Sequence, residues 1–116
     1  MINIVSSSRY KVERKKIRQY LEGVLIENGF SSDYIVNLVF IGRNKMRQIS
    51  SKYKNENVAL PVLAFPYKGE IIEGEKVIGE IIICYPQAVL LAAERNKRVN
   101  EIINQLSKHG FNNLLK

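Results

Sequence analysis

Few residues in this sequence could carry catalytic or metal-binding chemistry. It contains one histidine, His109, and one cysteine, Cys84. It holds no GxxxxGK[ST] or GxGxxG loop, no HExxH motif and no Ser/His/Asp order, so the common nucleotide-binding, zinc-peptidase and triad chemistries have no support. A lone histidine on the apolar side of a helix is more often structural than a ligand. From the residues alone, we interpret His109 as a structural side chain.

The single cysteine carries little chemistry in this setting. One thiol cannot form an internal disulfide or a multi-thiolate metal site, which fits a reducing cytoplasm. Cys84 lies in an apolar run far in sequence from His109, and we interpret it as a small buried residue rather than a reactive thiol. The longest apolar stretches, residues 34–41 and 78–84, are too short to cross a bilayer, and no leader-like segment precedes them. We therefore expect a cytoplasmic protein without a membrane partner.

The charge balance favours a polyanionic partner. The sequence has 18 Lys and Arg against 11 Asp and Glu, a formal net charge of +7, and a pI near 9.6. This charge favours nucleic acid without deciding it, because basic proteins have other partners too. The basic residues form two groups, and each is either an RNA-phosphate surface or a solvated helix face. The first group, at helical spacing, is Lys11, Arg14, Lys15 and Arg18, and the second is Arg43, Lys45, Arg47, Lys52 and Lys54.

Hydrophobic periodicity predicts the elements that position these groups. Strands are expected at residues 2–5, 34–41, 58–65 and 77–84, the third at a sheet edge because of Pro61. A first helix is expected to be capped by one of the serines at 6–8 and to end near Gly29. Further helices begin at residue 43, near Pro86 and near Val99. The predicted buried positions are Ile17, Tyr20, Leu21, Val24 and Leu25 in the first helix, Met46, Ile49 and Tyr53 in the second, and Ile102, Ile103, Leu106 and His109 in the last.

This order of elements predicts an α+β fold. We expect one domain over residues 1–116, with a small mixed sheet of about four strands and about four helices. Strand–helix–strand connections give the parallel pairs, and an exposed acidic hairpin at residues 68–76 gives the antiparallel pair.

Several short motifs, in this order, resemble the YbeY family of rRNA maturation endoribonucleases. They are Tyr53-Lys54, V-L-A-F-P at residues 62–66, G-E-I-I-I-C at residues 79–84, and His109-Gly110. The family pattern is Y-R, T-D-V-L-S-F-P, G-D-I-V-I and H-G-x-x-H-x-x-G-Y-D-H, and the spacing agrees within 53–66 and within 79–110. The resemblance spans nearly the whole chain and implies a single YbeY-like domain with zincin-like, metalloprotease-type architecture.

The resemblance also implies a metal site that this sequence only partly supplies. In the family, three histidines of the last motif bind one metal ion, usually zinc. Here His109 matches the first, Asn113 stands at the second, and the chain ends at Lys116 before a third. A catalytic zinc normally takes three protein ligands, and a carboxamide is a poor one. His109 and Lys54, the latter at the position of the family's arginine, are the implied catalytic residues.

Other family positions change too. Leu60 and Pro61 replace the family's T-D, Ala64 its serine, and Glu80 its aspartate.

The resemblance and these departures leave two candidate functions. One is a metal-dependent endoribonuclease acting on rRNA precursors; the other is a non-catalytic RNA-binding or ribosome-assembly factor that keeps the basic surface. The missing ligands favour the second, with rRNA or the small ribosomal subunit as partner. A domain that binds an acidic protein is a third interpretation.

Overall fold

The computed structural model describes residues 1–67, 71–72 and 74–116. The elements in this part of the chain, in order, are β1 (Ile2–Val5), α1 (Arg14–Glu27), β2 (Tyr34–Ile41), α2 (Arg43–Lys54), β3 (Val62–Pro66), β4 (Ile71–Ile72), β5 (Glu75–Cys84), α3 (Tyr85–Arg95) and α4 (Val99–Leu114). Four strands form the main path of the sheet in the order β1-β2-β5-β3, and β4 pairs with β5. The pairs β1–β2 and β2–β5 are parallel and β3–β5 is antiparallel, which confirms the predicted mixed sheet with four helices.

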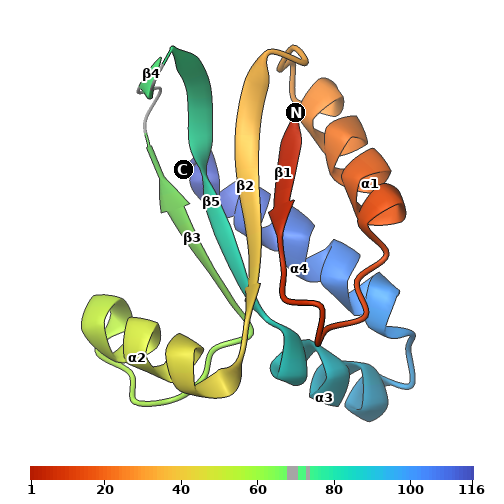
Figure 1. The fold of residues 1–116 in the computed structure, drawn as a ribbon, viewed down its shortest axis with the longest axis vertical. Helices are drawn as coiled ribbons and strands as arrows, with labels where there is room; N and C mark the ends of the chain where they lie inside the picture. Colours follow the sequence, from red (N-terminus) through yellow and green to blue (C-terminus); the bar gives the residue numbers. More distant parts are fainter. Residues whose placement is uncertain (68–70, 73) are drawn as a thin grey trace.

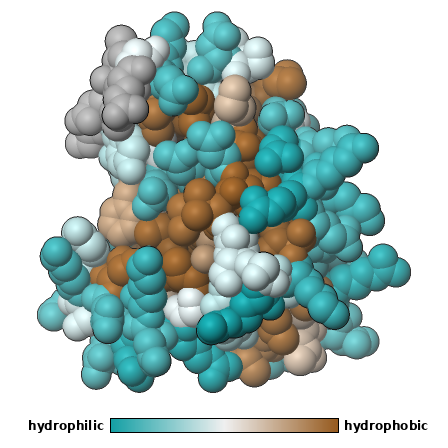
Figure 2. Space-filling model, in the orientation of Figure 1, coloured by the Kyte–Doolittle hydropathy of each residue, from teal (hydrophilic) through white to brown (hydrophobic). Residues whose placement is uncertain are grey.

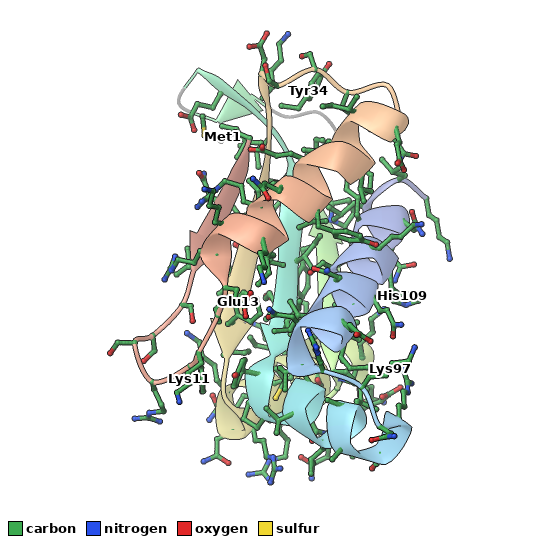
Figure 3. The ribbon with its side chains drawn as sticks, turned by 90° about the vertical axis from the view of Figure 1, so that its right-hand side faces the viewer. Met1, Lys11, Glu13, Tyr34, Lys97 and His109 are labelled. Carbon is green, nitrogen blue, oxygen red and sulfur yellow. The ribbon has the colours of Figure 1, made fainter. Side chains whose placement is uncertain are left out.

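Helices α1 and α4 lie on the same face of the sheet (Figures 1 and 3). The main core fills the space between these helices and that face, because their apolar stripes and the inward residues of the strands meet there. Helix α2 covers part of the opposite face, where Met46 packs with Ile41, Leu63, Ile82 and Cys84. No helix in the described part of the chain is long and apolar enough to cross a membrane.

The start of the first helix differs from its prediction. Helix α1 begins at Arg14, and no side chain caps it, so the three serines at 6–8 do not serve as N-caps. Instead, the Ser7 hydroxyl accepts a hydrogen bond from the Arg9 N–H at 3.1 Å in the turn that follows β1. Lys11 consequently lies before the helix. The predicted end is correct, because Asn28 is the C-cap and Gly29 follows with a φ of 83°.

Two predictions near β3 also need correction. Tyr53 is 58% exposed rather than buried, and the fully buried α2 positions are Met46 and Ser50. The strand predicted at 58–65 begins only at Val62, and residues 58–60 lie outside the sheet. The last hydrogen bond before the strand is the one that the Pro61 carbonyl accepts from the Cys84 N–H. The strand's predicted place at the sheet edge is confirmed. Of the hairpin predicted at 68–76, residues 68–70 and 73 lie outside the described residues, and β4 pairs with the start of β5.

Helix α4 approaches the sheet closely at Gly110. A Cβ atom on Gly110 would lie 2.6 Å from Cγ2 of Ile81 and 3.4 Å from Cγ2 of Val62. Ile81 is fully buried and β-branched, so its methyl group cannot move aside cheaply. The glycine next to the histidine is therefore needed for packing, and it fixes the position of the C-terminal half of α4 against β5 and β3.

This close approach predicts the effect of a small substitution. Gly110→Ala should lower the free energy of unfolding by about 1 kcal/mol, because overpacking outweighs the gain in helix propensity. The matched control is Gly23→Ala in α1, where a Cβ meets nothing within 4 Å and a gain of about 0.5–1 kcal/mol is expected. Urea unfolding of both variants checks this; equal stabilisation by the two changes would show that α4 does not touch the sheet at Gly110.

Candidate functional site

A groove lies along the outer edge of the sheet, where β3 meets the C-terminal ends of α2 and α4. It has a volume of about 450 Å³. Its walls combine apolar residues of the β3 segment with charged and amide side chains from the two helix ends. The lining residues are Lys54, Glu56, Leu60, Val62, Leu63, Ala64, Asn113 and Lys116. The groove brings together four positions at which the sequence motifs differ from the family pattern, namely Lys54, Leu60, Ala64 and Asn113.

The ends of two helices place the polar groups of the groove. Helix α2 ends at Lys54 because Asn55 adopts the left-handed conformation, with a φ of 55°. The Glu56 N–H donates to the Ser50 carbonyl at 3.3 Å, so the chain turns sharply at Asn55 and Glu56 follows close to Lys54. In α4, the buried Phe111 and Leu114 hold the last turns on the sheet and leave Asn113 half-buried at the groove.

His109 lies one helical turn before Asn113 but is exposed to solvent. The prediction that it continues the buried face of α4 is therefore wrong. Gly110, not His109, faces the sheet, because the buried positions run through Ser107, Gly110, Phe111 and Leu114. Figure 3 shows His109 on the side of α4 turned away from the strands. His109 does not line the groove, although its spacing of four residues puts it on the same side of the helix as Asn113.

A family model described as "Endoribonuclease YbeY" matches residues 3–115 of this chain. The chain belongs to the YbeY family. A curated "Endoribonuclease YbeY" from Thermodesulfovibrio yellowstonii is 27% identical over 98% of this chain and 68% of its own length. One from Desulforamulus reducens is 31% identical over 87% of this chain and 69% of its own length. The chain thus spans about two thirds of the length of these relatives.

A solved structure has the same architecture. The solution structure of TM1509 from Thermotoga maritima matches 96% of this chain and 69% of its own chain, with a TM-score of 0.66 and 20% identity. The likeness covers the sheet and helices described above and shows a shared fold. The two arms of the groove, α2–β3 and α4, are therefore parts of that common fold.

The donor groups at the groove do not fit the family's three-ligand metal centre. The YbeY family is metal-dependent. At the groove, Asn113 offers one carboxamide and Glu56 one carboxylate, while Lys54 and Lys116 add two ammonium groups. The one imidazole of the sequence, that of His109, lies outside the lining of the groove. Within residues 1–67, 71–72 and 74–116, no three His, Cys, Asp or Glu side chains lie close enough together to hold a metal ion. A zinc centre needs such a set, so we derive no chemical step through zinc.

The structure separates the two predicted basic groups. In the first, the Arg14 guanidinium donates to the Ile4 carbonyl at 2.8 Å, and Arg18 Nε donates to the Ile2 carbonyl at 3.3 Å. Both arginines thus satisfy carbonyls of the edge strand β1. Lys11 and Lys15 are exposed. Members of the second group are all exposed along α2, and this group reaches the groove at Lys54.

Glu80 does not line the groove. Its neighbours Gly79 and Ile81 face α4, since a Cβ on Gly79 would meet Leu114 and Ile81 lies against Gly110. Side chains alternate along a strand, so Glu80 points to the opposite face of the sheet. Glu56 and Lys116 line the groove although no sequence motif marked them. Lys116 follows Asn113 by three residues, which is the helical spacing that could have indicated it.

Cys84 is fully buried, as predicted, and burial raises the pKa of its thiol above its ordinary value. The thiolate is the nucleophile, and a buried, protonated thiol cannot form it until the fold opens. We therefore expect native protein to react with Ellman's reagent only as fast as it unfolds. Since the folded-state pKa is the higher one, Cys84 stabilises the fold fully below the unfolded pKa, and this contribution is lost as the pH rises above it. Fast labelling at pH 8 without denaturant would contradict this assignment.

Proposed function

We propose that this chain acts in rRNA maturation as an RNA-binding factor whose groove contacts RNA phosphates directly. The observation that carries the proposal is the position of Lys54 and Lys116, which line the groove together with Asn113. Asn113 occupies the place of the family's second metal ligand. The partners we propose are rRNA precursors or the small ribosomal subunit, encountered in the cytoplasm.

Electrostatics favours an anion over a divalent cation in this groove. Two ammonium groups face one carboxylate, that of Glu56, so the local balance is positive. The exposed cations of α2 and the net charge of +7 extend the positive potential beyond the groove. Phosphate groups gain from each of these charges, whereas a metal ion would be repelled. The apolar β3 residues leave room beside the lysines for a ribose or a base.

A metal-dependent endoribonuclease is the second candidate. It is favoured by the names of the curated relatives, which are endoribonucleases. His109 is exposed, so another subunit could donate the remaining ligands to a metal ion held by this imidazole. In that case hydrolysis would require the donated ligands, and removing them would leave the RNA-binding groove in place.

The salt dependence of RNA binding tests the proposal. If about five Lys and Arg side chains contact phosphates of a single-stranded rRNA fragment, log affinity should fall against log salt with a slope of roughly −3.5. Fluorescence anisotropy in the presence of EDTA measures this slope without any metal contribution. Absence of binding at low salt to every rRNA fragment tried would refute the proposed function.

A further inference from the structure

One face of the sheet is only partly covered. Helices α1 and α4 both lie on the other face, and α2 covers this one only around Met46 (Figure 1). The register of the strands places four side chains of this face in a line across the sheet, because Asn3 pairs with Asn37, Asn37 with Glu80, and Glu80 with Phe65. We name Asn3, Asn37, Glu80 and Phe65 the cross-strand row.

The cross-strand row keeps polar groups available on a surface that is otherwise apolar. The neighbouring row of the same face consists of Val5, Val39, Ile82 and Leu63. Figure 2 shows hydrophobic residues across the middle of this face and hydrophilic residues around them. Asn37 and Glu80 lie on the two central strands and are both half-buried. Apart from the contact below, neither side chain makes a hydrogen bond or ion pair within the described part of the chain.

Side-chain contacts continue the row from β1 to helix α2. Asn3 Nδ2 donates to Asn37 Oδ1 at 3.1 Å. At the other end, the Phe65 ring meets the Tyr53 ring edge-on, with centroids 5.1 Å apart. Lys52 Nζ lies 5.3 Å from the centroid of the Tyr53 ring. The row therefore leads from amide groups, past a carboxylate, to two aromatic rings and a cation.

We infer that this face binds the bases of single-stranded RNA. The Phe65 and Tyr53 rings offer stacking surfaces, and every base has a face that can stack. Asn37 and Glu80 offer groups that hydrogen-bond base edges, a carboxylate accepting from an amino group such as that of cytosine. In RNA-recognition motifs, a four-stranded sheet that carries aromatic residues stacks two or three unpaired bases in this way. The inference rests on the proposed function, since it names where the bases of the same RNA lie.

Two consecutive residues connect this face to the groove. Tyr53 contacts Phe65 on the face that carries the cross-strand row, and Lys54 lines the groove at the edge of β3. A single strand of RNA can therefore place a phosphate at Lys54 and the neighbouring base against Tyr53. The basic residues of α2 border the same face, which favours a polyanion and disfavours a second copy of this +7 chain.

A single tryptophan probe tests the inference. The sequence contains no tryptophan, so Tyr53→Trp reports only on this position, and the exposed side chain there tolerates the change. A single-stranded oligonucleotide should quench its fluorescence with the same midpoint as anisotropy, because stacking brings a base against the ring. The matched control is Val89→Trp on α3, which is 40% exposed and outside both surfaces, and it should not be quenched.

A second variant removes one stacking surface while keeping an apolar side chain. Phe65→Leu should weaken RNA binding at least about fivefold. Circular dichroism confirms that the variant folds. Unquenched Tyr53→Trp together with unchanged affinity of Phe65→Leu would overturn the inference, while salt-dependent RNA binding that needs Lys54 would leave the proposed function standing. Quenching by self-association without RNA, detected by light scattering, would instead assign the face to a second copy and also overturn it.

Discussion

Reversing the charge of Lys54 and Lys116 together is expected to weaken binding of a single-stranded rRNA fragment by well over tenfold. Both residues line the groove, so the change removes two phosphate contacts and puts two carboxylates in their place. The slope of log affinity against log salt should also become shallower, by about 1.4 for two lost contacts. Anisotropy titrations of Lys54→Glu/Lys116→Glu at several salt concentrations measure both effects.

The matched control changes the net charge equally at a distance from the groove. Arg9→Glu/Lys97→Glu alters two exposed residues that do not line it. A general charge effect would weaken RNA binding by both double variants alike. That result would show that the groove binds RNA no better than the rest of the basic surface. Arg14 and Arg18 are unsuitable for this experiment, since their side chains hold the carbonyls of β1 and their reversal would disturb the fold.

The second large effect is expected for the substitution Asn113→His, and it concerns metal binding. The new imidazole would lie four residues after His109, on the same side of α4, which is the arrangement of helical histidine pairs that bind zinc. A second ligand held on the same helix should tighten Zn²⁺ binding by roughly a hundredfold, because the second bond forms intramolecularly. Isothermal titration of Zn²⁺ into the parent and the variant measures the change.

A neighbouring substitution controls for the mere addition of histidine. Lys108→His adds an imidazole next to His109, but adjacent residues on a helix do not face each other. It should leave Zn²⁺ affinity close to that of the parent. An equal gain in Zn²⁺ affinity from both changes would show that side chains at positions 109 and 113 do not bind one metal ion together.

The architecture was largely predictable because its elements have strong local signals. The apolar β-branched run at Tyr34–Ile41 could be buried only in a central strand, and Pro61 placed the following strand at an edge. Pro86 lies in the first turn of α3, as predicted, and the helix ends at Asn96, which is left-handed with a φ of 53°. Parallel and antiparallel pairs then followed from the order of the connections.

The roles of single side chains were less predictable, since tertiary contacts decide them. Arg14 and Arg18 have the spacing of a phosphate-binding stripe, but β1 lies beside them and uses both as hydrogen-bond donors. His109 continues an apolar pattern, yet the close approach of α4 to Ile81 selects the neighbouring Gly110 as the inward position. Tyr53 likewise extends the apolar pattern of α2 and instead meets Phe65 at the surface.

The zinc content and RNA affinity of one purified sample test the central claim most directly. The claim is that the groove contacts RNA through Lys54 and Lys116 without a metal ion. Elemental analysis should find far less than one zinc per chain, and EDTA should leave the affinity for a single-stranded rRNA fragment unchanged. One tightly bound zinc per chain that His109→Ala removes, together with RNA binding that EDTA abolishes, would contradict the account.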